Sequence, residues 1–548
     1  MRQLAFRAAM AIYAARYWRP VTRHASDPVR TQTDVLRRIL AANRRTQFGA
    51  QHRFDEIRNP EQFRQQVPPQ DYEKLREYVE RQRRTGEPAL TREPPLFYAQ
   101  TSGSTGAPKY IPVCASALRL YRAEQSLFTY LQYRACPAAF SGQAFGIMGA
   151  AVEGTLDSGH SVGSVSGYLY ESLPRAVQSR FVVPPKVSAI ADYDLKYLVI
   201  LRLALAAPDI TYLGSPNPST FLRLLDMLNQ RRDVLLRSVE TGLLPELDAL
   251  DRATREAVLA RLHPEPARAR QLRTSRALTF ARLWPHIQLV TTWTGGSCGI
   301  ALDKLRATLP AHTKVMELGY QSTEGRGTIA LEAETSSGLP PLHHHFFEFV
   351  KQHDWDRGRL EFRGLGELEL HERYYILITT RAGLYRYFMN DLVEATGRYR
   401  NTPLLRFVQK GKGVTSLTGE KLYEAQVIQA VQEVTRRRGV APGFFLLVAD
   451  EHLSSYRLLL ETDGAPTSSL HEAAVDVDQR LGELNLEYHS KRKSGRLAPM
   501  TLTLLKPGAG EAYKAACVRA GQREGQFKPA LLQYRRDLVV AFDSYVIE

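Results

Sequence analysis

Residues 101–109 carry the strongest structural signal in this chain, a run rich in glycine and hydroxyl side chains that ends in Lys109. The run follows an apolar segment at residues 95–99, which predicts a strand, and a helix is expected from about Ser116. Glycines allow backbone N–H groups to close around an anion, and hydroxyls add further donors. A lysine supplies a point charge suited to phosphate. The pattern therefore predicts an anion-binding loop that follows a strand and lies ahead of a helix.

The spacing of this loop differs from that of a Walker A loop, which has four residues between its glycines and a lysine directly after the second. Here two residues separate the glycines, and the lysine comes three positions after the second. The candidate nucleotide-binding residues of the loop are Ser102, Gly103, Ser104, Thr105, Gly106 and Lys109. Such a stretch alone is also typical of a solvated turn, so its interpretation depends on the rest of the chain.

Two other polar segments follow predicted strands. Gly296 and Ser297 come after a strand predicted at residues 287–293, and a glycine pair at that point lets a ligand approach the backbone. Asp391 comes after a strand predicted at residues 374–380, and its carboxylate could accept hydrogen bonds from both hydroxyls of a ribose. Turns between strands often contain such residues, so each segment alone is weak evidence for a site.

A tyrosine, two hydroxyl residues and a glutamate follow the strand predicted at residues 314–318. The ring of Tyr320 can stack on a purine, and the hydroxyls of Ser322 and Thr323 can reach a phosphate. The carboxylate of Glu324 can hold Mg²⁺ against phosphate oxygens. This segment therefore offers groups for three parts of a magnesium nucleotide.

The chain has 548 residues, more than a single hydrophobic core usually supports, so we expect one large and one smaller domain. The Gly/Lys-rich residues 409–413 predict a hinge. Residues 1–408 are expected to form a large α/β domain that binds ATP and an acyl acid. Beyond the hinge, short strands alternate with helices, which predicts a small mobile α+β domain over residues 414–548.

The hydrophobic pattern predicts several elements along the chain. In the large domain, helices are expected at residues 29–40, 60–66 and 72–84. A hairpin is expected from residues 366–370 and 374–380. In the small domain, helices are expected at 420–438 and 470–484 and strands at 444–448, 456–461 and 500–505.

Composition narrows the functional classes. The formal net charge is +16, but the arginines are spread along the chain without a basic tail or an RNA-binding signature, so no nucleic-acid partner is expected. The four cysteines form no Cys-x-x-Cys pair, which favours free thiols in a cytoplasmic protein. Residues 1–20 are too short and too charged to span a bilayer. They predict a basic amphipathic helix that packs on the body or weakly touches a membrane surface.

The order of the polar segments, followed by a hinge and a small domain, resembles the adenylate-forming superfamily. The finer resemblance is to the auxin-responsive acyl acid amido synthetase family, and within it to the bacterial members. Residues 63–72, 161–167, 345–349 and 527–529 are similar to stretches of that family. The resemblance runs from about residue 28 to residue 535 and implies ATP and Mg²⁺ as cofactors.

The resemblance also implies a role for each matching residue. The loop at residues 101–109 handles the ATP phosphates, and Tyr320 with the two hydroxyl residues after it borders the adenylate. Glu324 is implied as the Mg²⁺ ligand, Asp391 as the ribose ligand and Lys528 as the catalytic lysine that reaches the α-phosphate, with Lys421 a weaker candidate of the same kind. The family usually has glycine directly before the aspartate, where this chain has Asn390, the non-glycine residue type that best tolerates a left-handed backbone.

The implied reaction has two halves. A substrate carboxylate attacks the α-phosphate to give an acyl-adenylate, and an amine such as an amino acid then displaces AMP after the small domain has moved. The acid site is expected to include the helix after residue 116, with Arg119 and Arg122 as carboxylate partners, and Ser164 in the loop 159–168.

Two other functions stay open at this point. A ligase that transfers the acyl group to coenzyme A or to a carrier-protein thiol would share the first half of the reaction. A nucleotide-binding or membrane-surface scaffold, favoured by the basic charge and the N-terminal helix, would have no catalytic activity.

Overall fold

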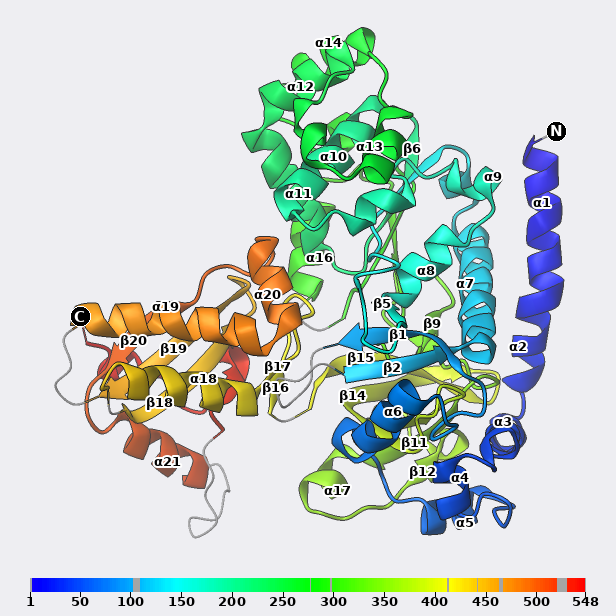
Figure 1. The fold of residues 1–548 in the computed structure, drawn as a ribbon, viewed down its shortest axis with the longest axis vertical. Coiled ribbons are helices and arrows are strands. Elements are labelled where there is room, and N and C mark those ends of the chain that lie inside the picture. The colour runs from blue at the N-terminus through cyan, green and yellow to red at the C-terminus, as the bar shows by residue number, and fades with distance from the viewer. Residues whose placement is uncertain are drawn as a thin grey trace. The chain divides into compact units, whose positions relative to one another are not determined.

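The computed structural model describes residues 2–101, 109–275, 277–295, 298–411, 413–440, 442–462, 467–519 and 530–547. The chain divides into two compact units. The large unit comprises Met1–Gln100 and Tyr110–Gln409, and the small unit comprises Thr101–Lys109 and Lys410–Glu548. Both units mix helices and strands, so the predicted α/β class with a large and a smaller part is confirmed (Figure 1).

A four-stranded parallel sheet lies in the large unit. Its strands, in spatial order, are β3 (Gln143–Gly146), β6 (Ile210–Gly214), β7 (Leu289–Thr292) and β8 (Lys314–Glu317). Because these strands run in one direction, the segments that follow β7 and β8 leave the sheet at the same edge. The polar segments predicted after those strands therefore begin side by side.

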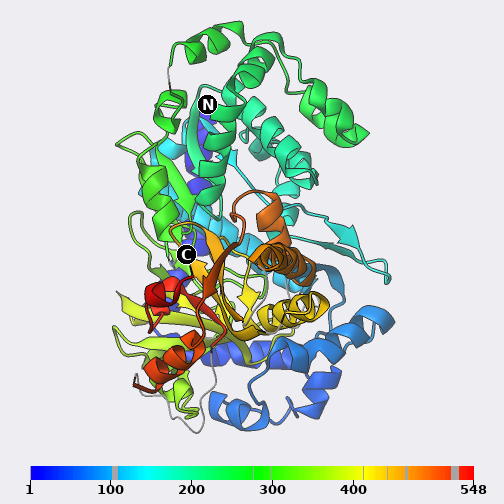
Figure 2. The ribbon, with the colours of Figure 1, turned by 90° about the vertical axis from the view of Figure 1, so that its left-hand side faces the viewer.

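Helices between β6 and β7 form a separate cluster beside this sheet, drawn in green in Figures 1 and 2. They share a core with the sheet in which the Leu213 and Val290 side chains of the strands are completely buried. The main helices around this core are α10 (Tyr193–Ala206), α11 (Ser219–Gln230), α12 (Arg232–Thr241), α13 (Arg252–Leu259), α14 (Pro266–Arg273) and α16 (Cys298–Arg306).

A larger sheet of seven strands, in the order β12-β11-β13-β14-β15-β10-β9, forms the second core of the large unit. Its short strands are β9 (Ile329–Ala330), β10 (Gly338–Leu339) and β12 (Arg363–Gly364). Its long central strands are β11 (Phe346–Lys351), β13 (Arg373–Thr379), β14 (Tyr387–Tyr399) and β15 (Thr402–Lys410). The predicted hairpin of residues 366–370 with 374–380 is wrong, because β13 pairs with β11 and β14 instead. The Glu367 side chain accepts a hydrogen bond from the Gly364 N–H at 2.5 Å and closes a 3-10 turn where a strand was expected.

Three helices of the large unit match their predictions. They are α3 (Pro28–Asn43), α5 (Pro60–Gln66) and α6 (Tyr72–Thr85). In each, an Asp or Asn side chain directly before the helix accepts a hydrogen bond from a first-turn N–H, which satisfies a group that the helix itself leaves open. A small sheet has the strand order β2-β1-β5-β4, with β1 (Pro95–Thr101), β2 (Lys109–Cys114), β4 (Gly154–Thr155) and β5 (Ser161–Gly163).

The N-terminal helix α1 (Arg2–Tyr13) packs on the long helix α7 (Ala115–Ala135), and Figure 1 shows the two side by side. The Phe6 ring meets the Tyr133 ring edge-on at a centroid distance of 5.5 Å. The predicted packing on the body is therefore confirmed. Among the described residues, no helix combines the length and the apolar character that a membrane span requires.

The small unit is built on a sheet in the order β20-β19-β18-β21, with β18 (Pro442–Asp450), β19 (Ser455–Thr462), β20 (Thr501–Leu505) and β21 (Leu532–Tyr534). Successive side chains of β18 point to opposite faces of this sheet. Leu447 and Ala449 therefore join the core with α18 (Glu424–Arg437) and α19 (Thr467–Leu484). Leu446 and Val448 join the core with α21 (Ala509–Arg519) on the other face. The helix predicted from residue 420 begins only at residue 424, because Leu422–Tyr423 form strand β17.

Candidate active site

Two turns at the edge of the parallel sheet are joined by the carboxylate of Glu317, the last residue of β8. It accepts hydrogen bonds from the Thr294 N–H at 2.7 Å, the Thr294 hydroxyl at 2.5 Å and the Gly319 N–H at 2.9 Å. Burial raises the pKa of Glu317, and these hydrogen bonds partly offset the rise. No motif in the sequence pointed to Glu317. An acidic side chain at the end of an apolar strand is nevertheless a pattern that could have indicated its role.

Tyr320 and Asp391, both predicted nucleotide-binding residues, are in direct contact. The Tyr320 hydroxyl donates to Asp391 Oδ2 at 2.5 Å, and the Tyr320 ring stacks on Phe407 at a centroid distance of 5.5 Å. Burial first, and then the charge of Asp391, raise the pKa of Tyr320 well above its ordinary value, so the hydroxyl stays protonated and donates. A Cβ on Gly327 would lie 2.1 Å from the Tyr320 ring, so this position needs glycine.

The completely buried Asp391 lies at a bulge in β14. The pairing with β13 shifts between Tyr375 and Leu377, so extra residues of β14 stand opposite this point. Asn390 has a left-handed backbone with φ of 49°, as expected for an asparagine that takes the place of glycine. Bulges turn side chains out of the regular alternation of a strand, and this one fixes the direction of the carboxylate.

A buried ionic cluster supports the start of β14. Glu348 on β11 accepts from Arg386 Nε at 3.0 Å and from Arg64 Nε at 3.1 Å. The Arg386 guanidinium also donates to the Val67 carbonyl at 2.7 Å, and the Gln70 N–H donates to the Arg386 carbonyl at 3.0 Å. The stretch 63–72, which carried part of the family resemblance, thus docks beside the segment that holds Asp391.

Glu324 lies in a tight turn between β8 and the rest of the large unit. The Ser322 N–H donates to the Gly325 carbonyl at 3.0 Å, and Arg326 Nη2 donates to the Leu318 carbonyl at 2.6 Å. Glu324 is buried, whereas Ser322 and Thr323 are half-buried. After burial and the contact with Asp391, the negative charge of Glu324 raises the pKa of Tyr320 further, so this carboxylate acts on the same hydroxyl as Asp391.

The donor set suits a magnesium nucleotide better than a protein-held metal. Among the residues that the structure describes, no group of three or more His, Cys, Asp or Glu side chains could hold a metal ion. Mg²⁺ typically takes one or two carboxylates and completes its coordination with substrate phosphates and water. The buried carboxylate of Glu324 is of the kind that could take such a place.

Several predicted residues fall outside the described part of the chain. These are Ser102, Gly103, Ser104, Thr105, Gly106, Gly296, Ser297 and Lys528. Lys109, the last residue of the predicted loop, is described and groups with the small unit. Its Nζ lies 3.5 Å from the hydroxyl of Tyr423 and 5.3 Å from the centre of that ring.

Lys421 lies in the small unit, next to an anchor that sequence reasoning missed. The completely buried Glu420 accepts from the Leu417 N–H at 2.6 Å and from the Tyr456 hydroxyl at 2.6 Å. Lys421 itself has a left-handed backbone with φ of 43°, and its carbonyl accepts from Asn485 Nδ2 at 3.0 Å. The loop that presents Lys421 is therefore fixed on both sides.

The three residues proposed for the acid do not join the Tyr320–Asp391 cluster. Arg119 and Arg122 lie on the exposed side of α7, and Arg119 Nη2 is 3.9 Å from Glu93 Oε1. Ser164 caps helix α8 (Val165–Glu171), because its hydroxyl oxygen accepts from the Gly167 N–H at 3.0 Å. The carboxylate of Glu124, on the same helix as the arginines, is buried.

The chain is similar to known proteins along most of its length. Residues 20–314 match the GH3 family N-terminal domain, residues 339–410 the GH3 family central domain and residues 425–537 the GH3 family C-terminal domain. It is 24% identical to indole-3-acetic acid-amido synthetase GH3.15 of Arabidopsis thaliana, over 91% of this chain and 89% of that protein.

Solved structures share the fold. The AtGH3.15 acyl acid amido synthetase in complex with 2,4-DB has a TM-score of 0.67 at 21% identity and covers 96% of both chains. A 2-hydroxyisobutyryl-CoA ligase in complex with 2-HIB-AMP and CoA has a TM-score of 0.57 at 11% identity, over 93% of this chain and 91% of that one. The three matched domains cover well over half of the sequence, and the chain therefore belongs to the GH3 family.

Proposed function

We propose that this protein is an ATP-dependent ligase that activates a carboxylic acid as an acyl-adenylate and transfers the acyl group to an amine, such as an amino acid. The observation that carries the proposal is the contact between Tyr320 and Asp391, with the Glu324 turn in the same cluster. It occurs in a chain that matches all three domains of the GH3 family.

Each half of the cluster has a task in the first step. Asp391 accepts the ribose hydroxyls, and Tyr320 keeps that carboxylate in one orientation by donating to Oδ2. Glu324 would hold Mg²⁺, which when bound neutralises phosphate charge. The loop 101–109 would bind the phosphates, with Ser322 and Thr323 as additional donors, and the substrate carboxylate attacks the α-phosphate as pyrophosphate leaves.

The second step transfers the acyl group to the acceptor. The amine attacks the acyl carbonyl, AMP leaves, and an amide forms. Lys528 of the small unit would already have stabilised charge at the α-phosphate in the first step, with Lys421 a weaker candidate for the same role. Movement of the small unit about residues 409–413 would change which residues face the nucleotide before the amine attacks. A bacterial source and a cytoplasmic location are part of the same proposal.

Product mass separates this function from its alternatives. The purified protein is incubated with ATP, Mg²⁺, one of a panel of acids (indole-3-acetic acid, 2,4-DB, other aromatic acids, fatty acids), and either the amino acids or coenzyme A. We expect pyrophosphate release that depends on the acid, and a product whose mass is that of acid plus amino acid minus water. A coenzyme A thioester as the main product would favour the thiol ligase, and release of no pyrophosphate with any acid would favour the scaffold.

A substitution at Asp391 tests whether the activity depends on the Tyr320–Asp391 cluster. Asp391→Asn removes the charge but keeps the shape of the side chain, so the acid-dependent pyrophosphate release should fall while the protein stays folded. Asp209→Asn, in the turn directly before β6, is the matched control and should leave the rate unchanged. Equal rates in the two variants would contradict the assigned nucleotide site.

A further inference from the structure

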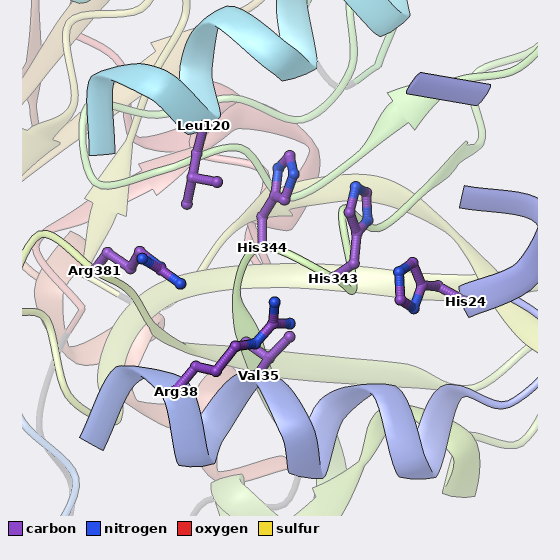
Figure 3. Close-up of a pocket in the computed structure, with 7 residues that line it drawn as sticks. All are labelled: His24, Val35, Arg38, Leu120, His343, His344 and Arg381. Atoms are coloured by element: carbon purple, nitrogen blue, oxygen red, sulfur yellow. The ribbon is translucent and has the colours of Figure 1, made fainter. Parts of the chain in front are cut away.

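A small cavity in the large unit is lined mainly by cationic and imidazole side chains. It has a volume of about 190 Å³ and is lined by His24, Val35, Arg38, Leu120, His343, His344 and Arg381 (Figure 3). The lining includes neither a carboxylate nor any of the residues of the Tyr320–Asp391 cluster. The cavity is thus a separate site, and it is smaller than the pockets of roughly 300–1,000 Å³ that usually hold drug-sized ligands.

The two guanidinium groups come from different elements. Arg38 extends from α3 and Arg381 from the loop after β13, and Figure 3 shows both side chains reaching into the space beneath the rings of His343 and His344. The Nε of Arg38 donates to the Asp34 carbonyl at 3.2 Å. Within the described part of the chain, no carboxylate lies within ion-pair distance of either guanidinium.

Two carboxylates near the cavity, those of Glu124 and Glu93, accept hydrogen bonds from other groups. The buried Glu124 accepts from His344 Nδ1 at 2.9 Å and lies 3.4 Å from His345 Nε2. Burial alone would raise the pKa of Glu124, but the hydrogen bonds from these two histidines hold it well below its ordinary value. Glu93 accepts from the Ser116 N–H at 2.8 Å. Glu124 is therefore committed to the histidines, and the charge of Glu93 acts on Arg381 only from beyond ion-pair distance.

The imidazoles add donors on the other side of the cavity. The rings of His24 and His343 stack at a centroid distance of 5.3 Å and an angle of 7°. His343 Nδ1 is buried and makes no hydrogen bond to any described residue. A buried polar atom without a partner costs free energy, and a bound hydrogen-bonding group would remove that cost.

Burial and neighbouring positive charge both disfavour the charged form of the residues that line the cavity. Burial first, and then the Arg38 charge, lower the pKa of His24 and of Arg381. Burial and the neighbouring histidines lower the pKa of His343. Each shift means that positive charge at this place is unfavourable in the free protein, and a bound anion reverses that penalty.

We propose that this cavity binds a compact oxyanion, of the class of phosphate, pyrophosphate or a short dicarboxylate. Arg38 and Arg381 form the charged contacts, and guanidinium groups match such anions with paired N–H donors. His343 and His344 supply further hydrogen bonds from the facing segment. The inference stands on this cavity alone and does not depend on the proposed ligase activity.

Binding to the full-length protein tests the proposal without any turnover. Phosphate, pyrophosphate and malonate are titrated separately by calorimetry and by thermal shift, with sodium chloride at matched ionic strength as the blank. We expect saturable binding of one ion per chain for at least one of the three, together with a rise in melting temperature. Preference for phosphate or pyrophosphate identifies a phosphate-type ligand, and preference for malonate identifies a carboxylate ligand.

Three variants locate the binding. Arg38→Gln changes an exposed position of α3, so the fold is retained, and it should weaken binding at least about 10-fold, as should Arg381→Gln. Arg37→Gln, the neighbouring position on the same helix, makes the same charge change outside the cavity and should leave affinity within about twofold. Absence of saturable binding by all three anions, or equal weakening by Arg37→Gln, would overturn the proposal.

Discussion

The Tyr320 hydroxyl donates a hydrogen bond to Asp391 and so fixes the orientation of that carboxylate. Tyr320→Phe removes this donor and leaves the ring stacked on Phe407. A hydrogen bond to a charged group contributes about 1.5–3 kcal/mol, so kcat/KM for acid-dependent pyrophosphate release should fall about 10-fold to 100-fold. The KM for ATP is measured in the same assay and should rise, because the ribose loses a fixed acceptor.

Tyr399→Phe is the matched control for this variant. Tyr399 is on the same strand as Asp391, and its ring packs on Trp18 at a centroid distance of 5.5 Å. Loss of its hydroxyl should leave kcat/KM unchanged. If both substitutions lowered activity to the same degree, the effect would belong to the strand and not to the carboxylate.

At the scale of single residues, a sequence pattern indicates candidate nucleotide-binding residues more readily than the residues that hold them in place. Tyr320 and Asp391 stand in polar segments after strands, and Asn390 could be assigned a left-handed backbone from its residue type. Glu317 and Glu420 were missed because each one also accepts a hydrogen bond from a residue distant in the sequence, Thr294 in the first case and Tyr456 in the second. Their importance depends on tertiary geometry, which a one-dimensional pattern does not contain.

The ionic cluster around Glu348 joins three elements, since it connects β11 with Arg64 of α5 and with Arg386 before β14. Glu348→Gln leaves the completely buried Arg386 without its counter-charge. Breaking a buried ion pair by removing one partner costs about 3–5 kcal/mol, so the free energy of unfolding of the large unit should fall by that amount in urea denaturation. Catalysis should weaken as well, because Asp391 lies on β14, the strand whose start this cluster supports.

An exposed ion pair on neighbouring elements provides the comparison. Glu369 lies 2.7 Å from Lys351 Nζ, and Glu369→Gln removes the same charge at the surface. Exposed pairs are screened by water and salt, so this variant should denature at nearly the same urea concentration as the unaltered protein. A small effect of Glu348→Gln, no larger than that of Glu369→Gln, would contradict the supporting role of the cluster.

Elements with local signals were predicted well, and elements that depend on distant partners were not. Helices α3, α5 and α6 begin at capping side chains and proline or acidic residues that are visible in the sequence. The hairpin at residues 366–380 failed because the Glu367 side chain closes a turn at Gly364, and β13 finds its partners in β11 and β14. Strand pairing over such separations is decided by the whole sheet.

At the scale of the whole molecule, the proposed chemistry uses residues from both units. Tyr320, Glu324 and Asp391 belong to the large unit, whereas Lys109 and Lys421 belong to the small unit. The sequence predicted a two-part α/β chain because the chain is longer than a single hydrophobic core supports and because a Gly/Lys-rich stretch interrupts it near residue 410. An enzyme divided in this way can assign its two half-reactions to different lysines, which makes the half-reactions separately measurable.

Lys528→Ala tests that division, since this lysine is proposed to stabilise charge while the acyl-adenylate forms. Loss of a preorganised positive group costs roughly 100-fold in the rate of the step it serves. We therefore expect acid-dependent exchange of pyrophosphate into ATP to fall by roughly that factor, while amide formation from a supplied acyl-adenylate falls much less. Lys506→Ala, an exposed lysine of the same unit, should change neither rate. Equal losses in both half-reactions would instead assign Lys528 to the folding or docking of its unit, because a residue that acts on one charge in one step cannot slow the two steps alike.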